Sequence, residues 1–88
     1  MAWTIEYAKS AQRDAKGLDP VIRTRIRQFL EKRLAIHEDP RELGKALQGN
    51  ANAYWRYRVG DYRIICAIQD QRLVVLVIKV GHRREIYR

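Results

Sequence analysis

Two short turn signals divide residues 54–80 into three runs that suit β-strands. Each run is rich in β-branched or aromatic residues, and the junctions Gly60-Asp61 and Asp70-Gln71 have the length of tight two-residue hairpin turns. Strands joined in this way are antiparallel neighbours, so the pattern predicts a three-stranded meander. Residues Leu73–Ile78 are apolar at every position, which is typical of a central strand covered on both faces. The predicted strands are Tyr54–Val59, Tyr62–Gln69 and Arg72–Val80.

The N-terminal half predicts a strand followed by a pair of helices. Alternating apolar residues indicate a strand over Ala2–Tyr7, and Ser10 suits the N-cap of a helix that Gly17 ends. Asp19-Pro20 marks a second, amphipathic helix that runs to about His37. After Asp39-Pro40 we expect a turn-rich connection to Asn52, with a brief helical turn around Arg41–Ala46. The chain therefore predicts one α+β domain over residues 1–88: an N-terminal strand, a two-helix hairpin, then the antiparallel meander.

Charge is the compositional property that most narrows the function. Eighteen Lys and Arg against ten Asp and Glu give a net charge of +8, which points to a polyanionic partner such as a nucleic acid. The lone cysteine cannot form an internal disulfide, and no Cys/His cluster has metal-ligand spacing, so we expect no metal and no cofactor. No signal peptide is visible and no apolar run is long enough to cross a membrane, so a cytoplasmic location is expected.

The first hairpin of the meander predicts a face rich in arginine. A two-residue turn at Gly60-Asp61 sets Arg58 opposite Arg63 and puts Arg56 and Tyr54 on the same side of the sheet. Like charges directly across a strand pair are destabilising, and a bound anion such as a phosphate would relieve the repulsion. The alternative is that these arginines are simply solvated. The opposite face is apolar and suits the helices; its residues are Trp55, Tyr57, Val59, Tyr62, Ile64, Cys66 and Ile68.

The C-terminal segment adds further basic and aromatic groups beside the last strand. His82, Arg83, Arg84 and Tyr87 follow that strand directly, and they are expected to stay near the arginine face unless the segment is only a solubilising tail. Trp3 and Trp55 suit the core better than a base-stacking role, and Cys66 suits a packed thiol.

Two segments, residues 47–64 and 80–87, resemble the RelE branch of the RelE/ParE toxin superfamily. The first contains Gly-Asp-Tyr-Arg and the second Val-Gly-His-Arg, and the order of elements agrees along the whole chain. The resemblance implies a compact α+β fold related to small microbial ribonucleases. It also implies a toxin of a type II toxin-antitoxin system that cuts messenger RNA in the ribosomal A site. A cognate antitoxin would neutralise it, and their complex would bind operator DNA through the antitoxin.

The resemblance also assigns site residues. Arg63, Arg83 and Tyr87 correspond to catalytic positions of the family, and Arg56 takes a place that well-studied members fill with lysine. The expected RNA-binding residues are Tyr54, Arg58, Lys45, His82 and Arg84.

The implied reaction is attack of the RNA 2′-hydroxyl on the adjacent phosphate, without a metal. Arg63 and Arg56 would stabilise the developing negative charge, Arg83 would act mainly electrostatically, and Tyr87 would stack on a base. The proton-transfer group stays open between Glu85, His82 and external groups such as water or ribosomal RNA. Two alternatives remain: a ParE-type inhibitor of DNA gyrase, and a nucleic-acid-binding module without catalytic activity.

Overall fold

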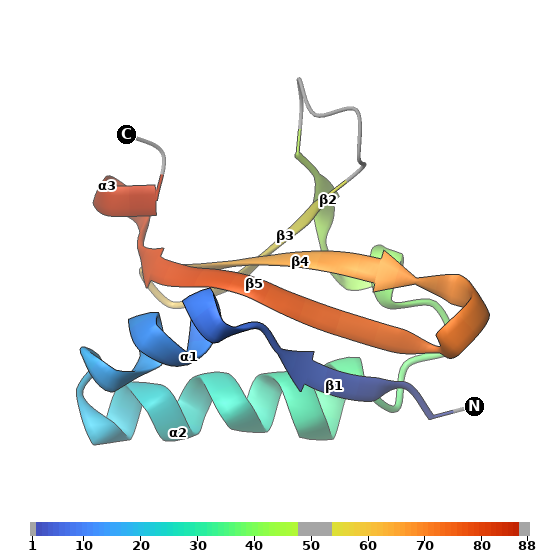
Figure 1. Ribbon diagram of the computed structural model, residues 1–88, viewed down its shortest axis with the longest axis horizontal. Coiled ribbons are helices and arrows are strands. Elements are labelled where there is room, and N and C mark those ends of the chain that lie inside the picture. The colour runs from blue at the N-terminus through green and yellow to red at the C-terminus, as the bar shows by residue number, and fades with distance from the viewer. Residues whose placement is uncertain (1, 48–53, 87–88) are drawn as a thin grey trace.

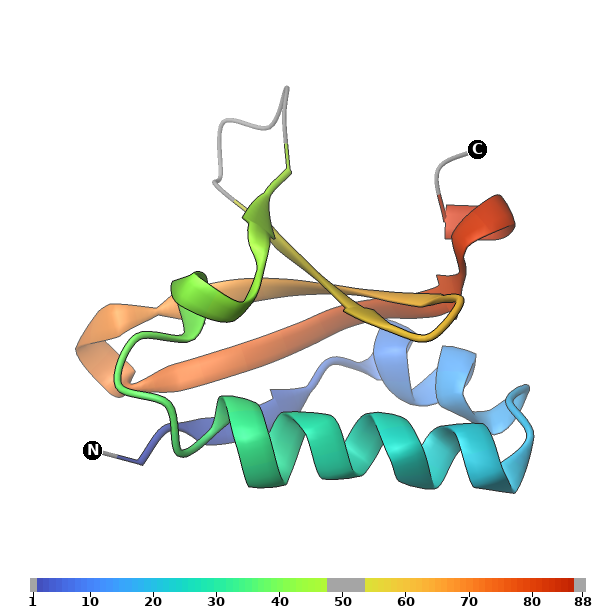
Figure 2. The ribbon, with the colours of Figure 1, turned by 180° about the vertical axis from the view of Figure 1, so that it is seen from behind.

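A computed structural model describes residues 2–47 and 54–86 of the chain. Two long helices, α1 and α2, lie on one face of a five-stranded sheet. The short C-terminal helix α3 and the edge strand β2 lie toward the opposite side (Figures 1 and 2). The elements follow in the order β1 (Thr4–Tyr7), α1 (Lys9–Lys16), α2 (Pro20–Gln28), η1 (Phe29–Leu34), η2 (Pro40–Leu43), β2 (Lys45–Ala46), β3 (Trp55–Val59), β4 (Tyr62–Gln69), η3 (Asp70–Arg72), β5 (Val74–His82) and α3 (Arg83–Ile86).

The predicted meander is present as β3, β4 and β5, but it is only part of a larger sheet. The strand order is β1-β5-β4-β3-β2, with β1 parallel to β5 and all other pairs antiparallel. Strand β5 is an interior strand of the sheet, as predicted, because it pairs with β1 on one edge and with β4 on the other. The prediction that it is covered on both faces is wrong, because both long helices pack on one side of the sheet (Figure 2). The two-residue strand β2 is too short to produce an alternation that a sequence pattern could reveal.

The joint between β4 and β5 also differs from the prediction. Instead of a two-residue turn, residues Asp70–Arg72 form a 3₁₀ turn, and Leu73 follows it with a φ of 53°. Farther along, Cys66 pairs with Val77 while Ile65 pairs with Lys79, so Ile78 is an extra residue in β5 and forms a β-bulge.

Helix α1 begins without the expected serine cap. Its N-cap is Ala8, whereas the Ser10 hydroxyl donates a hydrogen bond of 2.5 Å to the carbonyl oxygen of the bulged Ile78. The second helix begins as predicted, with the Asp19 carboxylate accepting a hydrogen bond from the backbone N–H of Val21. It does not stay α-helical: η1 is a π-type turn in which the N–H of Ala35 donates to the carbonyl oxygen of Leu30.

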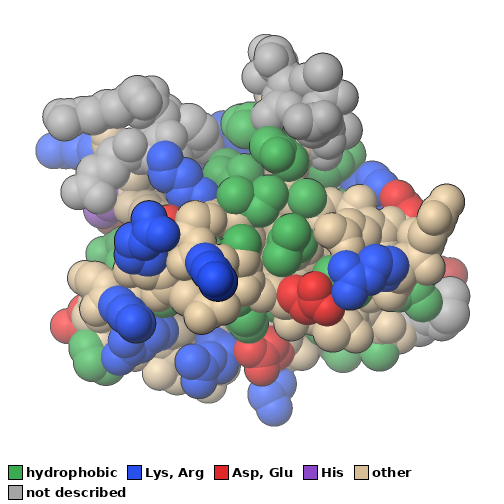
Figure 3. All heavy atoms as spheres, viewed as in Figure 1, with side chains coloured by type: hydrophobic (Ala, Val, Ile, Leu, Met, Phe, Trp, Pro, Cys, Tyr) green, Lys and Arg blue, Asp and Glu red, His purple; other side chains and the backbone are tan. Residues whose placement is uncertain are grey.

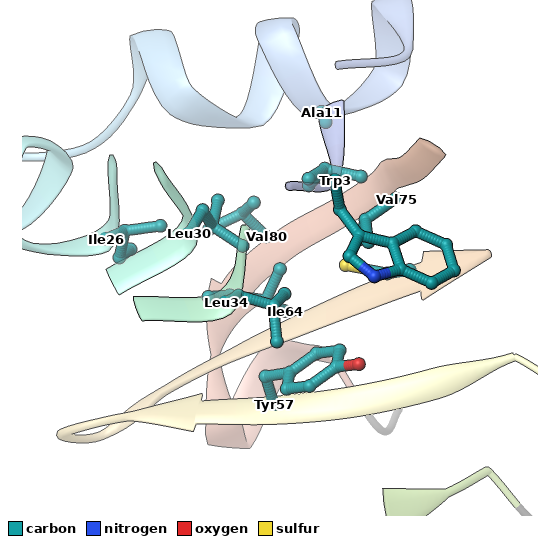
Figure 4. Packing of buried hydrophobic residues seen from close by; sticks show 11 residues of the cluster. Trp3, Ala11, Ile26, Leu30, Leu34, Tyr57, Ile64, Val75 and Val80 are labelled. Atoms are coloured by element: carbon teal, nitrogen blue, oxygen red, sulfur yellow. The ribbon is translucent and has the colours of Figure 1, made fainter. Parts of the chain in front are cut away.

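The hydrophobic core lies between the two helices and the sheet (Figure 4). Tyr57, Ile64 and Cys66, which the alternation assigned to one face, are almost fully buried there, and Trp3 joins them. The Trp3 indole N–H donates to the carbonyl oxygen of Glu38, so its polar atom is satisfied. Trp55 is half-buried and packs against the same cluster. The core assignments of both tryptophans and of Cys66 are confirmed. The cluster consists of Trp3, Ala11, Ile26, Leu30, Leu34, Tyr57, Ile64, Cys66, Val75, Val77 and Val80.

Candidate functional site

The hairpin of β3 and β4 has the predicted register. Val59 pairs with Tyr62 across a two-residue turn, Arg58 pairs with Arg63, and Arg56 pairs with Ile65. Gly60 has a φ of +59°, a conformation that glycine adopts without the steric cost that other residues pay. The alternation of the strands then places Arg56, Arg58 and Arg63 on the face opposite the helices.

These arginines line one hollow of about 390 Å³, which we call the arginine hollow. Lys45 of β2 contributes a fourth cation, because Lys45 pairs with Arg56 at the edge of the sheet. The complete lining is Glu42, Leu43, Gly44, Lys45, Arg56, Tyr57, Arg58 and Arg63. Its formal charge is +3, from four cations and one carboxylate. Such a site suits an anion that can accept several hydrogen bonds, and a phosphodiester is one.

The arginine side chains have different environments inside the hollow. Arg58 is exposed and its Nε donates to the carbonyl oxygen of Gly60 at 3.3 Å, whereas Arg63 is half-buried and donates to the carbonyl oxygen of Tyr62 at 3.4 Å. Each of these long bonds uses one of the five N–H donors of a guanidinium group. The guanidinium groups of Arg58 and Arg63 therefore make only weak hydrogen bonds with the main chain and keep most of their donors for a ligand.

The wall formed by η2 and β2 is fastened to the sheet by close packing. A Cβ atom on Gly44 would lie 2.6 Å from Cε1 of Tyr57 and 2.7 Å from the carbonyl oxygen of Arg56, so only glycine fits there. The Tyr57 hydroxyl donates to the carbonyl oxygen of Pro40 at 2.8 Å, and burial raises the pKa of this phenol. Tyr57 thus supports the hollow from below while belonging to the core.

An ion pair fastens the same wall at its other end. Both terminal nitrogens of Arg41 donate to the two carboxylate oxygens of Asp70, at 3.0 and 2.6 Å, and the guanidinium carbon lies 5.9 Å from the centre of the Trp55 ring. This bond to Arg41 lowers the pKa of Asp70 and raises that of Arg41. The segment before β2 is therefore attached both to β3 and to the turn that follows β4.

The residues of the C-terminal cluster do not line the arginine hollow where they are described. His82 pairs with Tyr62, its ring meets the Tyr62 ring edge-on at 5.6 Å, and its Nδ1 accepts a hydrogen bond from the N–H of Arg84. Because Tyr62 is on the helix side, His82 lies across the sheet from Arg63, so the structure does not bring His82 into the arginine hollow.

Arg83 lies at the same end of the sheet as the arginine hollow without lining it. It is exposed and begins α3, and its N–H donates to the carbonyl oxygen of Asp61 in the β3–β4 turn. Arg84 is exposed as well, Tyr54 is half-buried, and neither lines the hollow. Glu85 lies in α3, and Tyr87 lies outside the described residues.

Figure 3 shows how charge is distributed on the visible surface. Basic side chains gather over the half of the molecule that holds α3 and α1, and hydrophobic side chains gather beside them over the sheet. Among the described residues, no group of three or more His, Cys, Asp and Glu side chains is placed to hold a metal ion. Within the same residues, no helix is both long enough and apolar enough to cross a membrane.

Glu42 is the ionisable residue of the arginine hollow that the sequence patterns did not identify. It lies in η2, 14 or more positions before the arginines of β3, so no local spacing connects it to them. Only the pairing of β2 with β3 brings this carboxylate beside the cations.

The sequence of this chain is similar to that of known toxins. The family model described as "ParE toxin of type II toxin-antitoxin system, parDE" matches residues 5–87. Toxin RelG of Mycobacterium tuberculosis is 31% identical over 88 residues, which cover 100% of this chain and 99% of that protein. The mRNA interferase toxin RelE of Escherichia coli is 28% identical over 90 residues, covering 99% of this chain and 92% of that protein.

Solved structures agree with the fold. The toxin-antitoxin complex RelBE2 from Mycobacterium tuberculosis contains a chain with a TM-score of 0.83 and 28% identity, covering 97% of this chain and 95% of that one. The intact RelBE toxin-antitoxin complex of Escherichia coli contains a chain with a TM-score of 0.73 and 26% identity, covering 92% and 96%.

Proposed function

Because this chain belongs to the RelE branch of the RelE/ParE superfamily of type II toxins, we propose that it cuts messenger RNA in the ribosomal A site. The observation that carries the proposal is the arginine hollow, in which cations from β2, β3 and β4 converge on a space of about 390 Å³. Arg58 pairs directly with Arg63, and a bound phosphate would relieve the repulsion between the two.

The proposed reaction is an intramolecular transesterification of the RNA. The 2′-oxygen bonds to phosphorus, the bond from phosphorus to the 5′-oxygen breaks, and negative charge grows on the phosphoryl oxygens between these events. Arg63 and Arg56 lie on neighbouring strands of the hollow and supply planar donors for those oxygens. One well-placed donor of this kind contributes about 3–4 kcal/mol to transition-state stabilisation.

The other site residues have supporting roles in this proposal. Arg58 and Lys45 would bind the flanking phosphates. The exposed Arg83 would add positive charge at the end of the sheet, next to the β3–β4 turn. Tyr87 is the proposed base-stacking group, and Tyr54 and Arg84 are proposed to contact RNA beyond the hollow.

The ribosome is the proposed source of substrate alignment. The described part of the hollow offers strong charge stabilisers and a single carboxylate, so correct placement of the 2′-hydroxyl has to come largely from elsewhere. Alignment of reacting groups can supply roughly 7–11 kcal/mol. A site built in this way would be nearly inactive on free RNA and active on translated message in the cytoplasm.

An antitoxin is the proposed protein partner. The structural relatives from Mycobacterium tuberculosis and Escherichia coli are toxin-antitoxin complexes, which supports a similar partnership for this chain. A segment that neutralises a hollow with a formal charge of +3 should be acidic and amphipathic. The complex is proposed to reach operator DNA through the antitoxin.

The name of the matching family model favours a second candidate, inhibition of DNA gyrase by a ParE-type toxin. Primer extension on messenger RNA from cells expressing the chain separates the two. Cleavage within A-site codons is the expected result. DNA breaks that depend on gyrase, with intact message, would refute RNA cleavage and favour the ParE-type function. Absence of both activities from folded protein would leave a non-catalytic binding module as the function.

A further inference from the structure

Among the described residues that line the arginine hollow, Glu42 is the one carboxylate. The side chains of Lys45, Arg56, Arg58 and Arg63 around it are cations at neutral pH and serve as donors rather than as proton acceptors. The sequence suggests two other groups for proton transfer: His82, which packs against Tyr62 on the opposite face of the sheet, and Glu85, which lies in α3, a helix whose described side chains do not line the hollow. Glu42 is exposed, so a substrate that enters the hollow can reach it.

The turn that carries Glu42 is held in place from both sides. Asp39 caps it through its side chain, which accepts a hydrogen bond from the N–H of Arg41. Arg41 is bound to Asp70 by two hydrogen bonds, and Gly44 packs directly on the Tyr57 ring. The backbone that carries Glu42 is therefore fixed before and after it, so the carboxylate is kept beside the hollow, within reach of a substrate that enters it.

We propose that Glu42 is the general base of this toxin and takes the proton from the attacking 2′-hydroxyl. This inference rests on the proposed RNA cleavage. As the bond between the 2′-oxygen and phosphorus forms, the proton passes to the Glu42 carboxylate. The bond from phosphorus to the 5′-oxygen then breaks, and that oxygen takes a proton from water. The products are a 2′,3′-cyclic phosphate and a 5′-hydroxyl, and Glu42 returns its proton to solvent.

The cations of the hollow would stabilise negative charge on the phosphate and would not take the proton. Lys45 of β2, Arg56 and Arg58 of β3 and Arg63 of β4 line the hollow together with Glu42, while Asp39 and Arg41 lie beside it in the chain. A general base accepts a proton only in its deprotonated form. The cleavage rate should therefore rise with pH through an acid limb and then level off.

The test is single-turnover cleavage of messenger RNA on programmed ribosomes by wild type and by Glu42→Gln. The glutamine keeps the size of the side chain and removes its ability to accept the proton. We expect the rate to fall by about 100- to 10,000-fold and to lose its acid limb. Binding to the ribosome and the melting temperature should stay as in wild type. Glu42→Asp should recover part of the rate together with the acid limb.

Glu38→Gln is the matched control, since Glu38 is an exposed carboxylate close in the chain that does not line the hollow. It should cleave like wild type. Three results would overturn the assignment of Glu42: an unchanged rate in Glu42→Gln, a slow variant that keeps its acid limb, or a loss of cleavage that follows loss of folding or ribosome binding. If wild type itself leaves the message intact, the proposed function fails first, and the role of Glu42 fails with it.

Discussion

Arg58 and Arg63 face each other directly across the hairpin of β3 and β4, an arrangement that costs the folded protein stability. Residues at paired positions have Cβ atoms about 5 Å apart, so the two guanidinium groups repel each other unless an anion lies between them. The hydrogen bonds of Arg58 to the carbonyl oxygen of Gly60 and of Arg63 to that of Tyr62 are long, so they contribute little in return. These arginines are therefore expected to lower the stability of the folded protein while serving RNA cleavage. Substituting one of them should separate the two effects.

Arg63→Ala is expected to slow messenger RNA cleavage by about 100- to 1,000-fold, the effect of removing one donor from a developing oxyanion. Its melting temperature should be equal to or slightly above that of wild type, because the repulsion with Arg58 disappears. Single-turnover cleavage and thermal melts measure both effects. Arg13→Ala is the control, an exposed arginine of α1 outside the hollow. Full cleavage activity in Arg63→Ala would remove this residue from the mechanism.

At the scale of elements, the short segment of η2 and β2 decides whether the arginine hollow has a second wall. Among the described residues its pairing with β3 is short: two residues of β2 pair with β3, and the N–H of Leu47 donates to the carbonyl oxygen of Tyr54. Its position therefore depends on tertiary contacts as well as on strand pairing. Three contacts supply that position: Gly44 on the Tyr57 ring, the Tyr57 hydroxyl on Pro40, and Arg41 on Asp70. The wall carries Glu42 and Lys45, so its loss would remove both a carboxylate and a cation from the site.

Gly44→Ala tests this wall. The added methyl group would lie within 3 Å of the Tyr57 ring and of the Arg56 carbonyl oxygen, so the segment or the ring has to move. We expect a loss of about 1–3 kcal/mol in the free energy of unfolding, together with strongly reduced cleavage. Gly17→Ala is the matched control, because its Cβ would meet only the Asp14 carbonyl oxygen, at an ordinary 3.6 Å. Urea unfolding of both variants measures the difference, and equal stabilities would contradict the packing argument.

For the whole molecule, the sheet separates a buried hydrophobic core from a basic surface. The helices cover one face and pack on the core (Figures 1 and 4), whereas the other face carries the basic residues of the hollow. Tyr57 and Cys66 belong to the covered side, and burial raises the pKa of both groups. A raised pKa in the folded state means that these groups favour folding while they are protonated. Their contribution is complete below the pKa of the unfolded chain and is lost as the pH rises above it.

The free energy of unfolding should therefore fall at alkaline pH. The loss should begin near pH 8.5, where an unfolded thiol ionises, and steepen near pH 10, where an unfolded phenol does, by up to about 1.4 kcal/mol per pH unit for each group. Denaturant unfolding at pH 7, 9 and 10.5 measures it. Cys66→Ala should be less stable at pH 7 and should have a shallower slope between pH 8.5 and 10. An identical slope in that variant would show that the thiol does not contribute.

The sequence by itself determined those features that depend on neighbours in the chain. The alternation along residues 55–68 and the two-residue turn at Gly60-Asp61 placed Arg56, Arg58 and Arg63 on one face, because side-chain direction in a strand reverses at every residue. The cap at Asp19 and the burial of Cys66 followed in the same way. Each of these is a local relation that a single stretch of residues contains.

Tertiary structure decided the rest, because those features need contacts between distant segments. The parallel pairing of β1 with β5, the donation from Ser10 to the bulge at Ile78, and the position of His82 on the helix side all join residues brought together only by folding. The same holds for Glu42, which lines the hollow beside the arginines because Gly44, two residues later, packs on Tyr57. Local periodicity contains no information on such pairings; the packing of β2 against β3 provides it.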